Sequence, residues 1–93
     1  MRHLARKRRD EEFRARVAEF YGPDIIFWDD HDNAIIGFVT RCGQEPFALY
    51  DTGQAVKNYV KDGMTEEEAQ EWIDFNWNAW IGPTTPGSLE VLD

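Results

Sequence analysis

The chain has 93 residues, of which 42% are hydrophobic, 14% aromatic and 30% charged, and its formal net charge is −8. This length supports a single domain over residues 1–93 and leaves too little chain for a second core. One cysteine, Cys42, and two histidines exclude an internal disulfide and a structural zinc site, and we expect a cytoplasmic protein. No apolar run approaches the length of about 20 residues that a membrane-spanning helix needs.

Charge is distributed unevenly along the chain. Residues 1–16 carry seven Arg and Lys against three carboxylates, a net of +4, whereas residues 17–93 carry three against fifteen, a net of −12. The acidic part would repel a phosphate backbone, so nucleic acid is only a minor alternative partner, through Arg6 to Arg16. The same basic side chains can instead pair with the acidic part of this chain or of a second copy.

The first half of the chain predicts a helix followed by strands. Apolar residues at helical spacing predict a helix over 4–20, with 1–16 as a basic, partly mobile arm, and Gly22-Pro23 ends the helix. Segments 24–29, 34–41 and 47–50 are short and rich in β-branched and aromatic residues. Because short turns separate them, we expect a three-stranded antiparallel meander.

The second half predicts two helices and a tail. Asp51 or Thr52 caps a helix that runs to Gly63, and Thr65 with Glu68 forms a capping box for a second helix over 66 to about 80. The core then spans residues 17–82, and the Pro/Gly-rich tail 83–93 either docks as an edge strand or stays loose. The expected fold is α+β, in the order α-β-β-β-α-α, with helices packed on the sheet.

Both faces of the predicted sheet are apolar. Strict alternation sends one set of side chains to the helices and a second set to the opposite side, namely Ile26, Trp28, Ile35 and Val39. A second apolar face is either covered by the N-terminal helix or left for a partner. An uncovered face, or a short strand after Pro86, would allow self-association into a homo-oligomer.

Two groups of residues suggest chemistry. The turn Asp29, Asp30, His31 and Asp32 offers oxygen ligands and an imidazole to a metal, but it lacks the ligand spacing of a calcium loop, and an ordinary acidic turn explains it better. Cys42 follows Arg41, which favours the thiolate, but no base or oxyanion motif accompanies it. We therefore predict no catalytic residue, no metal site and no cofactor.

Aromatic and basic side chains suggest contacts with another macromolecule. Trp and Arg are typical of binding hot spots. The candidates for partner binding are Arg6, Arg8, Arg9, Trp28, Trp77 and Trp80. For the tryptophans, the alternative is burial in the core, because a small domain has to bury most of its large apolar side chains.

Several short motifs taken together resemble small uncharacterised bacteriophage-encoded proteins. They are Asp32-Asn33-Ala34-Ile35-Ile36-Gly37, Arg41-Cys42-Gly43, Asp62-Gly63-Met64-Thr65, Glu67-Glu68-Ala69, Phe75-Asn76, Ala79-Trp80-Ile81-Gly82 and Thr85-Pro86. The likeness covers residues 24–86 and carries over no catalytic residue. It implies an infected bacterial cell as the setting, where small acidic proteins of this kind often act on host machinery, including defence nucleases.

These observations predict a non-enzymatic accessory protein that binds a host or phage protein and inhibits a defence or nucleic-acid-processing system. Its acidic part suits a basic partner surface. Two alternatives stay open at this point: a homodimer that binds a small ligand or a metal, and a structural component of a phage particle.

Overall fold

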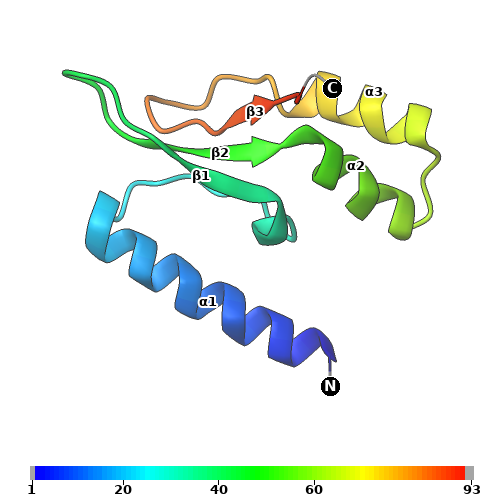
Figure 1. The fold of residues 1–93 in the computed structure, drawn as a ribbon, viewed down its shortest axis with the longest axis horizontal. Coiled ribbons are helices and arrows are strands. Elements are labelled where there is room, and N and C mark those ends of the chain that lie inside the picture. The colour runs from blue at the N-terminus through cyan, green and yellow to red at the C-terminus, as the bar shows by residue number, and fades with distance from the viewer. Residues whose placement is uncertain (1, 92–93) are drawn as a thin grey trace.

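The computed structural model describes the backbone of residues 2–91 and the side chains of residues 9–91. The first helix, α1 (Arg2–Tyr21), contains the helix predicted over 4–20. It ends as expected, because Gly22 adopts a left-handed φ of 95° and its N–H donates to the Ala18 carbonyl. Figure 1 shows α1 as one continuous helix, so the backbone of most of the basic segment shares a helix with Val17, which is buried.

Three short strands form a mixed sheet. A turn of 3-10 helix, η1 (Asp32–Ala34), leads into β1 (Ile35–Val39), which pairs antiparallel with β2 (Phe47–Asp51). The helices α2 (Thr52–Lys61) and α3 (Glu66–Asn76) follow, and β3 (Gly87–Leu89) then pairs parallel with β2. A parallel pair needs a long crossover, which α2 and α3 supply, and β2 is therefore the central strand (Figure 1).

The observed order is α-β-β-α-α-β, so the expected antiparallel meander of order α-β-β-β-α-α is wrong, whereas the α+β class is confirmed. Segment 24–29 forms no strand. Its Trp28 N–H donates to the Tyr50 hydroxyl at 2.9 Å, and the Asp24 carbonyl accepts from Thr84 Oγ1 at 2.6 Å. Side chains therefore form hydrogen bonds with backbone groups of this segment that a strand would use to pair with its neighbour. The third strand of the sheet comes instead from the tail.

Local capping sets the helix ends. The Asp51 carboxylate accepts from Gly53 N, and Thr65 and Glu68 form the predicted capping box with two bonds of 3.1 Å. The predicted extension of α3 to about residue 80 is wrong, because α3 ends at Asn76. There the side-chain amides of Asn76 and Asn78 donate to the carbonyls of Trp72 and Asp74, which removes the need for further helical turns.

A β-bulge changes which side chains face the core. Ile35 pairs with Tyr50 and Gly37 with Leu49, so Ile36 is an extra residue in β1. In a strand without a bulge, Ile35 and Phe38 would point to opposite faces of the sheet. Because of the bulge, Ile35 lies opposite the buried Tyr50 and Phe38 lies opposite the buried Ala48. Both side chains therefore pack against the core. The expected division of β1 into two alternating faces is therefore wrong.

The core lies between the sheet, α2 and α3, and α1 packs beside it. Its buried members are Ala34, Ala48, Tyr50, Ala55, Ile73 and Trp77. From α1, the Phe13 ring lies 6.4 Å from the Phe38 ring, and Tyr21 stacks on Phe38 at 4.6 Å. Aromatic pairs at these distances stabilise the fold by more than the burial of their apolar area alone.

The substitution Gly87→Ala tests the docking of β3. A Cβ at Gly87 would lie 2.9 Å from Phe47 Cε2 and 3.4 Å from Leu49 Cδ1. We expect overpacking to lower the free energy of unfolding by about 1 to 3 kcal/mol in denaturant unfolding. Gly82→Ala is the matched control, because its Cβ meets nothing within 4 Å, and we expect a change within about 0.5 kcal/mol. Equal effects of the two substitutions would contradict the position of β3.

The buried Tyr50 predicts a loss of stability at alkaline pH. Burial raises the pKa of its phenol from 10.0 to about 12. The unfolded chain therefore loses this proton first, near pH 10, and stability falls as pH rises from there towards the folded pKa. Between about pH 9 and about pH 11 this group lowers the free energy of unfolding by about 1 kcal/mol. Denaturant unfolding of Tyr50→Phe over the same range should lose that much less than wild type, and an unchanged loss would refute the assignment.

Candidate functional site

The acidic turn between α1 and β1 is held by an arginine from α1. The Arg14 guanidinium donates to both oxygens of Asp32, at 2.9 and 2.8 Å, and to Asp29 at 3.3 Å. It also lies 4.7 Å from the centre of the Phe27 ring. Hydrogen bonding to Asp32 raises the pKa of the Arg14 guanidinium above its usual value. The Asp32 side chain is only 5% exposed, so this bidentate pair neutralises a nearly buried carboxylate.

His31, in the same turn, is buried. Its Nδ1 lies 3.0 Å from Asn58 Nδ2, and because an amide nitrogen only donates, Nδ1 accepts this bond. The His31 ring also packs on Tyr59 and makes a T-shaped contact with Trp77, with centroid distances of 4.6 and 5.2 Å. Asn58 further exchanges two hydrogen bonds with Asn33. The imidazole is thus part of the packing between η1 and α2.

The turn does not assemble a set of metal ligands. Of the four candidates, Asp29 and Asp32 bond to Arg14, and His31 bonds to Asn58. Asp30 adopts a left-handed φ of 68°. Within residues 9–91, no group of three or more His, Cys, Asp or Glu side chains is arranged to hold a metal ion. The geometry is that of a turn that joins α1 to the core.

Two concave regions flank this turn and the sheet. A cleft of about 500 Å³ lies between α1, η1 and α2, with both cations and carboxylates in its lining. Its residues are Arg9, Asp10, Phe13, Asp30, Asp32, Asn33, Asn58, Lys61 and Asp62. A second hollow, of about 350 Å³, lies between Phe47 and the segment after α3, and Arg41 and Trp80 also line it.

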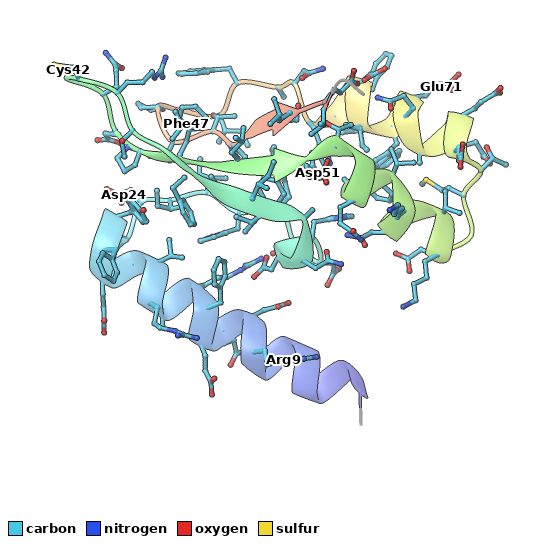
Figure 2. The ribbon with its side chains drawn as sticks, in the orientation of Figure 1. Arg9, Asp24, Cys42, Phe47, Asp51 and Glu71 are labelled. Atoms are coloured by element: carbon cyan, nitrogen blue, oxygen red, sulfur yellow. The ribbon has the colours of Figure 1, made fainter. Side chains whose placement is uncertain are left out.

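Figure 2 shows Cys42 at the tip of the β1–β2 hairpin, where it is exposed.

The predicted partner-binding residues have different positions. Trp77 is 6% exposed and belongs to the core, and Trp28 is half-buried with its ring 5.8 Å from that of Trp77. Trp80 is 77% exposed, and Arg9 lies exposed on α1. Arg6 and Arg8 lie outside the residues whose side chains are described. Of the tryptophans, only Trp80 therefore presents most of its surface to a partner.

Sequence reasoning missed two exposed aromatic residues on α3. Trp72 is 48% and Phe75 is 88% exposed, and neither is among the predicted partner-binding residues. The buried positions are Ala69, Ile73 and Trp77, which recur every four residues. Trp72 and Phe75 lie beside that stripe, with Glu68 and Glu71, so their acidic neighbours at helical spacing are the signal that distinguishes them.

Comparison of the chain with protein-family models, with curated proteins and with solved structures gives no match. None of the helices among the described residues is both long enough and apolar enough to cross a membrane. Function is therefore inferred from surface chemistry.

The substitution Arg14→Met tests the charge compensation at the turn. It leaves Asp32 without its cation, and breaking a buried pair in this way typically costs about 3 to 5 kcal/mol. The Arg14 side chain is 30% exposed, so we expect a smaller loss of about 2 kcal/mol in denaturant unfolding.

Arg16→Met is the matched control on the same helix, because Arg16 is exposed, and its effect should stay within about 0.5 kcal/mol. Adding Asp32→Asn to Arg14→Met removes the stranded charge and should restore part of the loss. A loss as large for Arg16→Met as for Arg14→Met would contradict this account.

Proposed function

We propose that this protein is a non-enzymatic binding protein that contacts a partner protein through exposed aromatic side chains on α3 and the segment after it. The observation that carries the proposal is the exposure of Phe75 and Trp80, at 88% and 77%, while Trp77 between them is buried. Ile81 adds a further exposed apolar side chain, at 57%. Phe75 shares a groove with Trp72 on α3, and Ile81 directly follows Trp80 in the chain. Neighbouring large apolar groups at a surface are typical of interaction sites, and tryptophan is enriched in binding hot spots.

Charge supports a basic partner. The formal net charge of the chain is −8, and most of its cations lie in the first 16 residues. A strongly acidic surface speeds association with a basic protein and discourages contact with nucleic acid.

The proposal includes a setting and an effect. The likeness of residues 24–86 to small bacteriophage proteins points to a bacterial host cell, in which the partner is a host or phage protein. A basic surface that normally contacts nucleic acid is the type of target that an acidic binder blocks. Inhibition of a defence or nucleic-acid-processing system is the effect that follows from such blocking.

Affinity capture from a bacterial lysate tests the proposal. Tagged wild type is compared with the double variant Phe75→Ser, Trp80→Ser, followed by mass spectrometry of the retained proteins. Since both side chains are exposed, the substitutions should leave the thermal unfolding midpoint nearly unchanged while removing a partner that wild type retains.

Val91→Ser is the control, because Val91 is an exposed apolar residue outside α3 and residues 77–81, and this variant should retain the partner. A partner captured equally by all three proteins would argue against the proposed surface. Conversion of any metabolite by the purified protein would argue against the non-enzymatic assignment.

A further inference from the structure

One face of α3 combines exposed aromatic rings with carboxylates. A shallow groove on it is lined by Met64, Glu68, Glu71, Trp72, Phe75 and Asn76. Figure 2 shows Glu71 on α3, at the end of the molecule opposite the hairpin tip that carries Cys42. Within the described part of the chain, Glu71 takes part in no hydrogen bond or ion pair. We call this set of six residues the α3 face.

The α3 face carries negative charge, and no basic side chain of α3 neutralises it. The helix contains five carboxylates and no Lys or Arg, and its acidic residues are Glu66, Glu67, Glu68, Glu71 and Asp74. The first three stabilise the positive end of the helix dipole. Glu71 and Asp74 lie beyond the first turn, where this reason for a carboxylate no longer applies.

The protein itself shows how such a combination holds an arginine. The Arg14 guanidinium is bound by Asp29 and Asp32 and lies over the Phe27 ring at 4.7 Å. Arg41 lies over the Phe47 ring at 5.3 Å. An aromatic face attracts the planar guanidinium, while a carboxylate at its edge accepts its N–H groups. The α3 face offers rings and carboxylates together, but no cation lines it.

We infer that the α3 face binds an arginine-rich segment of the partner protein, with a guanidinium stacked on Trp72 or Phe75 and paired with Glu71. This inference rests on the proposed function and names the chemistry of the partner. Met64 supplies an apolar base for the aliphatic part of the arginine side chain. A phosphate-bearing ligand is disfavoured by the carboxylates, and a lysine ammonium stacks less well than a planar guanidinium.

The test is a titration of the labelled full-length protein with an oligo-arginine peptide, followed by NMR of the tryptophan indole and backbone amide signals. An oligo-lysine peptide of equal length has the same charge and is the comparison ligand. We expect the arginine peptide to shift the Trp72 indole signal and to bind about fivefold tighter than the lysine peptide.

Variants separate this site from general charge attraction. Trp72→Ala with Phe75→Ala, and separately Glu71→Gln, should each weaken binding of the arginine peptide by about fivefold or more. Phe20→Ala is the matched control, because Phe20 is an exposed aromatic residue on α1, outside the α3 face and the segment after α3, and it should leave the affinity unchanged. Equal affinity for all variants, equal affinity for the two peptides, or no binding would each overturn the inference.

Partner capture distinguishes failure of this inference from failure of the proposed function. If Trp80→Ser alone abolishes capture while Trp72→Ala has no effect, the binding function stands and the inference about the α3 face is wrong. If the double variant Phe75→Ser, Trp80→Ser retains the partner as wild type does, the proposed surface is wrong as a whole.

Discussion

Burial of the Trp77 ring is the constraint on which the rest of the structure depends. The ring lies 5.8 Å from Trp28, 5.2 Å from His31 and 5.4 Å from Tyr50, and its Nε1 donates to the Tyr59 hydroxyl at 3.2 Å. One side chain thus contacts the segment before β1, the central strand and α2. Trp77 directly follows α3 at the four-residue spacing of the buried Ala69 and Ile73, and this spacing points its ring into the core. The residues after it are then carried to the surface, and these include Trp80.

The second constraint is electrostatic, and it positions α1. A helix with few apolar residues gains little from packing alone, and α1 buries only Val17 among the described residues. Arg14 adds a bidentate pair with Asp32, a bond to Asp29 and a contact with the Phe27 ring. The turn therefore has two partners: Arg14 of α1 holds its carboxylates, and Asn58 of α2 holds His31. Its acidic composition, which resembles a metal site in the sequence, is explained by these two contacts.

Local features of the sequence were sufficient to predict that the three helices exist and how α1 ends and α3 begins, whereas they could not predict which distant segments pair. The box of Thr65 and Glu68 spans three residues and Gly22 acts within one turn, so both can be identified from neighbours alone. The state of segment 24–29 depends on Tyr50 and Thr84, of which Thr84 lies 60 residues from Asp24, and no local pattern encodes that bond. The same limit applies to the candidate site. Which aromatic rings are exposed depends on where α3 ends, and that end is set by the side-chain amides of Asn76 and Asn78.

The exposure of these aromatic side chains is not explained simply by a lack of space in a small core. Four of the eight buried apolar residues in the described part of the chain are alanines, at positions 34, 48, 55 and 69. Small residues at these positions let the strands and helices approach closely, and larger side chains there would add buried apolar area only if the elements moved apart. The chain nevertheless keeps Phe75 and Trp80 almost fully in solvent, where each exposed ring forgoes about 1.5 to 3 kcal/mol of burial free energy. A polar residue at either position would avoid an apolar patch at no cost to the packing. An exposed apolar surface of this kind is the feature on which the proposed contact with a partner protein rests.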